Sequence, residues 1–253
     1  MRFYDFLDKQ PAIGKLVVIE GTERALAERA LEVVLDRLLP PEVRELNLAR
    51  FEAGELADAS RIREAAQAMP FLAERRVVVV ADTQTMRAPL RHEVWAVAQE
   101  VPEGNTLVLL DLLSPRSQRP EPFGALAGRT ALRVDTTTSE DTRVRFVEES
   151  LQHLGVKAEA RVVDVLARSQ ADLGSVRNDL EKLALTSKKI TLKDLEREAL
   201  AIEDPKAYKY ASALAEGNIT EALSIAHESF ASDPRGAAIP LLSALATECN
   251  YLW

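Results

Sequence analysis

The chain of 253 residues is long enough for one large domain or for two to three small ones. Apolar residues make up 47% of the sequence and charged residues 28%, a globular composition in which disorder is not the default. The net charge of −8 argues against a protein that binds DNA without the help of a partner. Lysines and arginines that neutralise phosphates supply most of the non-specific affinity for DNA.

The first half of the chain alternates short apolar runs with amphipathic stretches. Runs that are rich in β-branched residues, or that alternate, predict strands at residues 16–19, 45–51, 76–81, 106–110 and 131–134. Apolar residues at helical spacing predict helices at residues 20–39, 57–69, 89–100 and 123–127, with Met69 on the inner side of the second. Strands alternating with helices pair in parallel, so we expect a three-layer α/β domain over residues 1–136.

The pattern changes at a polar linker, residues 135–139, after which there are no strand signals. Three apolar stripes at helical spacing follow, and Thr191 with Asp194 caps a fourth predicted helix. These signals predict a small helical bundle over residues 137–203. After an Asp-Pro break, residues 204–253 are predicted as helices that begin a third domain, which we expect to be truncated.

The segment after the first predicted strand bears on nucleotide hydrolysis. A phosphate-binding loop needs G-x-x-x-x-G-K-[ST], whose backbone N–H groups and lysine hold phosphates. Here the segment reads EGTERAL, with one glycine and no Lys-Thr pair. Glu20 and Glu23 also place negative charge where a phosphate would lie. We therefore expect no ATP hydrolysis, and we interpret Asp82 and Asp111, which end two apolar strands, as turn residues.

Other signals of catalysis are missing from the sequence. None of the three histidines has a second histidine at i+3 or i+4, and no G-x-S-x-G motif is present. The single cysteine excludes an internal disulfide and a multi-cysteine metal site, and fits a reducing cytoplasm. We expect no catalytic residue, no metal and no cofactor.

Two further features concern DNA and membranes. Arg116 and Arg119, in the polar segment SPRSQRP, are the best candidates for residues that face DNA, although a solvated turn is the more ordinary role for such a pair. No apolar run reaches the about 20 residues that a membrane-spanning helix needs, and the start of the chain lacks the layout of a signal peptide.

An apolar pair stands out in the sequence QAMPFLAERRVVVV. Pro70 ends a predicted helix, so Phe71 and Leu72 lie in a connection, and connections usually run over the surface. One interpretation is that both side chains fold into the core. The other is that they form a hydrophobic plug for the pocket of a partner protein.

Four segments resemble one protein family, in the family's order. They are the first strand with EGTERALAERAL, then ELNLARFEAGE, AAQAMPFLAERRVVVVAD and DLGSVRNDLEKLALTSKKITLKDLE. The chain resembles, over essentially its whole length, the delta subunit of the bacterial DNA polymerase III clamp loader. The third and fourth segments are the most specific.

The resemblance implies an AAA+-like α/β domain with a degenerate phosphate loop, a helical second domain and the start of a helical collar domain. It implies that the chain binds the beta sliding clamp through Met69, Pro70, Phe71 and Leu72 and opens the ring for loading on primed DNA. Gamma/tau and delta-prime subunits would be further partners, with primer–template DNA contacted weakly or indirectly. The expected place is the cytoplasm.

A protein of this family is not an enzyme by itself; only as part of the polymerase III holoenzyme would it count with a DNA-directed DNA polymerase, a nucleotidyltransferase. Two alternatives stay open at this stage. One is an active AAA+ ATPase, which the missing phosphate loop argues against. The other is a stand-alone DNA-binding protein, which the net charge of −8 argues against.

Overall fold

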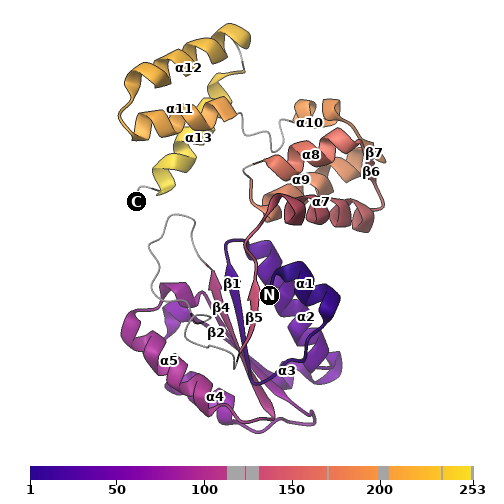
Figure 1. The fold of residues 1–253 in the computed structure, drawn as a ribbon, viewed down its shortest axis with the longest axis vertical. Coiled ribbons are helices and arrows are strands. Elements are labelled where there is room, and N and C mark those ends of the chain that lie inside the picture. The colour runs from indigo at the N-terminus through magenta and orange to yellow at the C-terminus, as the bar shows by residue number, and fades with distance from the viewer. Residues whose placement is uncertain (113–122, 124–130, 170, 199–204, 235, 252–253) are drawn as a thin grey trace. The chain divides into compact units, whose positions relative to one another are not determined.

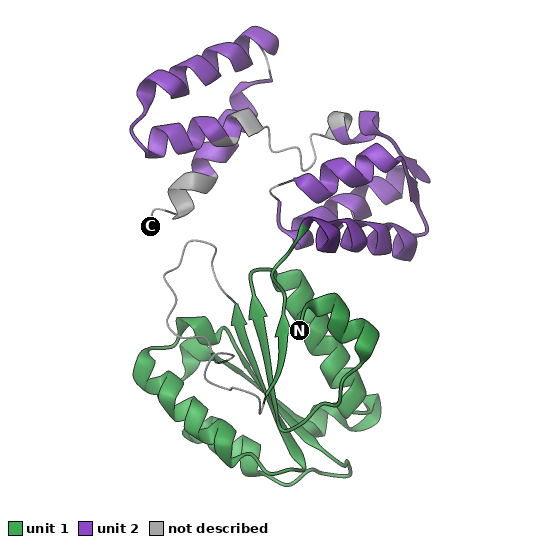
Figure 2. Cartoon of the chain, in the orientation of Figure 1, with its two compact units in different colours: residues 1–139 green, residues 140–253 purple. Residues whose placement is uncertain are grey.

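The computed structural model describes residues 1–112, 123, 131–169, 171–198, 205–234 and 236–251. The chain divides into two compact units, Met1–Ser139 and Glu140–Trp253 (Figure 2). None of the described helices is long and apolar enough to cross a membrane.

The first unit is built on a sheet of five parallel strands (Figure 1). In sheet order the strands are β2 (Leu48–Glu52), β3 (Arg76–Ala81), β4 (Asn105–Leu112), β1 (Leu16–Gly21) and β5 (Leu132–Asp135). Every residue of β4 is buried, as expected for the central strand of a sheet that is covered on both faces. The carboxyl ends of all five strands therefore meet at one edge of the sheet.

Helices cover both faces of this sheet. They are α1 (Phe3–Lys9), α2 (Arg24–Leu38), α3 (Arg44–Asn47), α4 (Ser60–Gln67) and α5 (Ala88–Glu100). Figure 1 shows α1 and α2 on one side and α4 and α5 on the other. Alternate strand residues such as Val18, Val78 and Leu107 pack against Ile62 and Val94 of α4 and α5. The three-layer α/β fold predicted from the sequence is confirmed.

Three details of this unit differ from the expectations. Residues 45–47 are the end of helix α3 and not part of a strand, so β2 begins only at Leu48. Helix α1 was not predicted. Helix α4 ends at Gln67, and Met69 lies beyond it with its side chain 87% exposed instead of facing inward. Most of the predicted helix 123–127 lies outside the described residues, although Phe123 is buried.

The second unit consists mainly of helices, arranged around two separate cores. The first core belongs to α7 (Glu140–Leu154), α8 (Ala160–Arg168), α9 (Leu173–Thr186) and α10 (Leu192–Glu198). The second belongs to α11 (Pro205–Ala215), α12 (Ile219–Ser232) and α13 (Ala238–Tyr251). Valine and leucine fill the first core, whereas alanine dominates the second.

The expectation of no strands in this half is wrong. Two short strands pair in parallel in the part of this unit formed by α7 to α10. They are β6 (Lys157–Ala158), which follows α7, and β7 (Lys189–Ile190), which follows α9. The capping signal at Thr191 is confirmed, because the carboxylate of Asp194 accepts hydrogen bonds from the Thr191 backbone N–H and hydroxyl at 2.9 and 2.8 Å. The three-domain division at residues 136 and 203 stays a prediction, and the second of these bounds lies outside the described residues.

Asp172 caps helix α9 and makes the stability of this unit depend on pH. Its carboxylate accepts hydrogen bonds from the backbone N–H of Ser175 at 2.9 Å and from the Ser175 hydroxyl at 2.7 Å. Burial raises the pKa of Asp172, but these hydrogen bonds outweigh burial and hold the pKa below its ordinary value of 3.8. The stabilisation is therefore complete above the unfolded-state pKa and is lost as pH falls through the folded-state pKa.

Replacing Asp172 with alanine is expected to lower the free energy of unfolding by about 1 kcal/mol at neutral pH. The difference between Asp172→Ala and the natural chain should shrink at acidic pH, as pH falls through the lowered folded-state pKa of Asp172 and the carboxylate is protonated. Urea unfolding followed by circular dichroism at both pH values checks this. An equal difference at the two pH values would show that the charged cap is not the cause.

Candidate functional site

The carboxyl edge of the sheet, where α/β proteins commonly bind ligands, is closed near β1 by a close backbone approach. Gly21 ends β1 with φ of +133°, and a Cβ atom there would lie 2.6 Å from the Thr137 nitrogen and 2.5 Å from the Thr136 hydroxyl. The Thr136 N–H donates to the Glu20 carbonyl at 2.7 Å. The turn after β1 thus packs against the chain leaving β5, as only glycine permits.

Replacing Gly21 with alanine is expected to destabilise the first unit by about 2–4 kcal/mol, because the new methyl group meets backbone atoms and the φ disfavours a side chain. Gly14→Ala is the matched control, since no atom lies within 4 Å of the added methyl group there. Urea unfolding of both variants measures the effect. Equal stability of the two variants would contradict this description of the turn.

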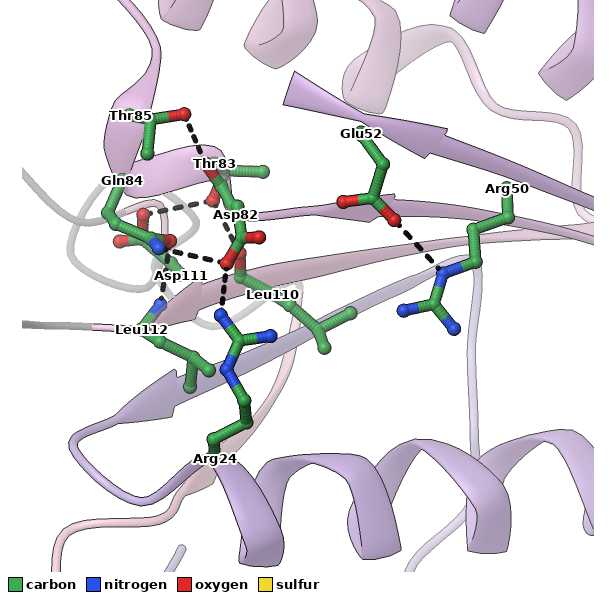
Figure 3. Close-up of polar contacts among 10 residues, drawn as sticks. All are labelled: Arg24, Arg50, Glu52, Asp82, Thr83, Gln84, Thr85, Leu110, Asp111 and Leu112. Atoms are coloured by element: carbon green, nitrogen blue, oxygen red, sulfur yellow. Dashed lines mark hydrogen bonds and ion pairs between the residues drawn. The ribbon is translucent and has the colours of Figure 1, made fainter. Parts of the chain in front are cut away.

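The polar side chains at the same edge bind one another (Figure 3). Asp82, in the left-handed region at φ of 52°, accepts hydrogen bonds from Arg24 at 2.8 Å and from Gln84 at 3.1 Å. The Gln84 side-chain oxygen accepts a hydrogen bond from the Leu112 backbone N–H at 3.1 Å. Arg24 begins helix α2, where a phosphate-binding protein would direct free N–H groups at its ligand, and here it is paired with a carboxylate.

Beneath this edge lies a buried ion pair. The Arg91 guanidinium donates to both carboxylate oxygens of Asp111 at 3.0 and 3.2 Å, and the two side chains are only 5% and 1% exposed. Thr83 donates its hydroxyl to the same carboxylate at 2.9 Å. The Phe123 ring lies 4.8 Å from the Arg91 guanidinium carbon. Asp111 is thus a buried structural partner, and the prediction that it is a turn residue is wrong.

An exposed apolar loop, residues 68–75, lies at the opposite edge of the sheet, between α4 and β3. Met69, Phe71 and Leu72 are 87%, 57% and 79% exposed, and Pro70 is half-buried. The interpretation in which Phe71 and Leu72 fold into the core is therefore wrong. Leu46, at the end of α3, adds a fourth side chain that is 54% exposed. Exposed apolar side chains grouped in this way are typical of a binding surface.

Asn47 anchors the middle of the 68–75 loop. Its side-chain oxygen accepts the Phe71 N–H at 2.7 Å, and its side-chain nitrogen donates to the Phe71 carbonyl at 2.8 Å. The same nitrogen donates to the Val43 carbonyl at 2.9 Å. Asn47 itself is fully buried. The loop therefore exposes the Phe71 side chain, while the buried Asn47 amide fixes the Phe71 backbone.

Two further side chains anchor the ends of the loop. Asn105 donates to the Ala66 and Ala68 carbonyls at 2.8 and 2.9 Å, which satisfies carbonyl groups at the end of α4. Arg76 donates to the Ala65 and Leu46 carbonyls, each at 3.1 Å. Between these anchors Leu72 takes a left-handed conformation with φ of 52°, which costs a non-glycine residue about 1–2 kcal/mol.

The sequence of the α/β unit matches one family model. Residues 18–111 match the family model described as "DNA polymerase III, delta subunit". Over these residues the chain is similar to the delta-subunit family of DNA polymerase III. This similarity supports a role in DNA replication. The matched segment includes the whole 68–75 loop together with Asn47 and Asn105.

Solved structures share the fold. The DNA clamp loader delta protein of Bacillus subtilis is 15% identical with a TM-score of 0.55, over 97% of this chain and 75% of that one. The replication initiator DnaA of Aquifex aeolicus is 12% identical with a TM-score of 0.54, over 84% and 67%. The RuvB branch migration motor of Thermotoga maritima is 11% identical with a TM-score of 0.51, over 85% and 72%. The fold is thus AAA+-like. Among curated proteins, none matches this sequence.

The other predicted site residues divide into two groups. Arg116 and Arg119 lie outside the described residues. Met69, Pro70, Phe71 and Leu72 all lie in the one exposed loop. The sequence did not predict Leu46 and Asn47 as site residues, because they fall in the segment whose alternation predicts a strand. Within the part of the chain that the structure describes, no group of three His, Cys, Asp or Glu side chains is placed to hold a metal ion.

Proposed function

We propose that this chain is the clamp-binding subunit of a clamp loader and that it binds the beta sliding clamp through the 68–75 loop. The single observation that carries the proposal is the exposure of Met69, Phe71 and Leu72 on an anchored backbone. An apolar surface of this kind fits an apolar pocket on a protein, and it has no chemistry for nucleotides or for phosphates.

The free energy expected from burying Phe71 and Leu72 against a partner is large enough for a function in binding. Full burial of a phenylalanine or leucine side chain contributes about 1.5–3 kcal/mol. Phe71 and Leu72 together would therefore contribute a factor of about 10² to 10⁴ in affinity. Because the backbone of the loop is already anchored, little of this energy is spent on ordering it.

Opening of the clamp follows from the same binding. A partner shifts an equilibrium between closed and open rings by the ratio of its affinities for the two forms. We infer that the chain binds the open form more tightly and so opens one interface of the ring without chemistry of its own. Gamma/tau and delta-prime subunits would supply the ATP-driven steps, and Arg116 and Arg119 are the proposed weak contacts with primer–template DNA.

The closed carboxyl edge of the sheet supports the absence of ATPase activity. Gly21 packs against Thr136, and Arg24 and Asp82 pair with each other at the position of a phosphate site. An active AAA+ ATPase therefore stays the weaker candidate. A stand-alone DNA-binding protein is weaker still, because the chain carries a net charge of −8.

Titration of purified sliding clamp with the intact chain tests the proposal. We expect saturable binding that changes little between low and moderate salt, because apolar contacts carry it. Parallel titrations use ATP and a primer–template DNA. Tight ATP binding, or steeply salt-dependent DNA binding without clamp binding, would favour the alternatives.

A further inference from the structure

We propose that Asn47 is the positioning residue of the clamp-binding loop: it holds the Phe71 backbone so that the Phe71 and Leu72 side chains are presented to the partner before contact. This inference rests on the proposed function for its effect on binding. Its structural part, the anchoring of Phe71 by Asn47, can be tested in the free chain.

The geometry of Asn47 is that of a substitute for a neighbouring strand. Its amide accepts the Phe71 N–H at 2.7 Å and donates to the Phe71 carbonyl at 2.8 Å, which are the two bonds that a paired strand residue would make. Only the amides of asparagine and glutamine carry a donor and an acceptor in this fixed arrangement. The third bond, to Val43 at 2.9 Å, fixes the amide itself within α3.

These bonds do not serve the core of the unit. The residue that they hold has a side chain that is 57% exposed, and the next residue, Leu72, is 79% exposed. A fully buried polar side chain thus fixes a backbone whose side chains, Phe71 and Leu72, are mostly exposed and are not part of the hydrophobic core described for this unit. The conformation that results includes Leu72 at φ of 52°, which a loop without this anchor would leave.

Anchoring has a measurable consequence for association. Fixing the backbone of one residue costs about 1–2 kcal/mol, and here that cost is met during folding. Without Asn47, only a fraction of free molecules would hold the binding-competent loop, and the apparent affinity would fall by that fraction. We therefore expect Asn47→Ala to bind the clamp about 5- to 30-fold more weakly, with the loss mainly in the association rate.

Two variants and two readouts test the proposal in the intact chain. Asn47→Ala removes all three hydrogen bonds of the side chain. Asn47→Ser keeps a hydroxyl that can bond the Val43 carbonyl four residues earlier but is too short to reach Phe71. Hydrogen exchange at the Phe71 amide is measured in the free chain, and association and dissociation rates are measured with purified sliding clamp. Both variants should expose the Phe71 amide to exchange and slow association.

The control separates positioning from general stability. Val94→Ala weakens the core under α5, far from the loop in sequence, and should lower thermal stability without slowing association. Unchanged exchange at Phe71 in Asn47→Ser would overturn the anchoring. Faster exchange with an unchanged association rate would overturn the positioning role. A natural chain that does not bind the clamp would refute the proposed function, while the exchange result would still decide whether Asn47 anchors the loop.

Discussion

Replacing Phe71 and Leu72 together with alanine is expected to weaken binding to the sliding clamp by about 10²- to 10⁴-fold and to leave the fold intact. Both effects follow from exposure, because the two side chains are 57% and 79% exposed in the free chain and contribute little to its core. The backbone anchors of the loop, Asn47 and Asn105, are untouched by the substitutions.

The measurement is a clamp titration of the double variant beside the natural chain, with circular dichroism and thermal unfolding of both. Leu185→Ala is the matched control, since Leu185 is 87% exposed but belongs to helix α9 of the second unit. It should bind as the natural chain does. A double variant that binds normally, or that no longer folds, would contradict the assignment of the loop.

Replacing Arg91 with methionine is expected to lower the free energy of unfolding of the first unit by about 3–5 kcal/mol. The substitution leaves the Asp111 carboxylate in the core, where it is 1% exposed and retains only the Thr83 hydroxyl among the bonds described above. An uncompensated buried charge is among the most destabilising changes that a single substitution can produce.

Urea unfolding of Arg91→Met measures this effect, and the double variant Arg91→Met with Asp111→Leu provides the control. Removal of both charges should restore much of the lost stability, because apolar residues of similar volume replace a buried pair with little net cost. Clamp binding of the folded double variant should be unchanged. A single variant as stable as the natural chain would show that the pair is not part of the core.

The sheet could be predicted because its signals are local. The strands β1, β3 and β4 are continuous apolar runs, and runs of this kind are buried wherever they lie in the sequence. The break near residue 139 was also visible, as apolar spacing changes there from runs to helical stripes. These features need no knowledge of distant partners.

The segment ELNLARF alternates like a strand, but its first part is helical, and the difference has a physical reason. Its alternation places Leu46 and Leu48 on one face of a supposed strand, with Asn47 on the other. In the structure Leu46 is exposed and Asn47 is fully buried, the reverse of what polarity predicts. Burial of Asn47 is possible only because Phe71, 24 residues later, satisfies both ends of its amide.

Two other features, the exposure of Met69 and the burial of Asp111, also depend on residues that are distant in the sequence and could not be predicted from it. Pro70 marks the end of a helix, but the exposure of Met69 depends on the anchoring of the helix end by Asn105, which comes from β4. Asp111 resembles any turn aspartate until Arg91 is placed beside it, 20 residues away in the sequence. Periodicity cannot reveal such pairs, since it reports only the face on which a residue lies.

The most direct test of clamp binding through the 68–75 loop is site-specific photocrosslinking. A photoreactive phenylalanine analogue replaces Phe71 in one sample of the intact chain and Phe230 in another, because Phe230 is also exposed, at 43%, but lies in helix α12. Each sample is irradiated with the sliding clamp and analysed by mass spectrometry. The proposed function predicts a crosslink from position 71 into an apolar pocket of the clamp and none from position 230. A stable complex without a crosslink from position 71 would contradict it.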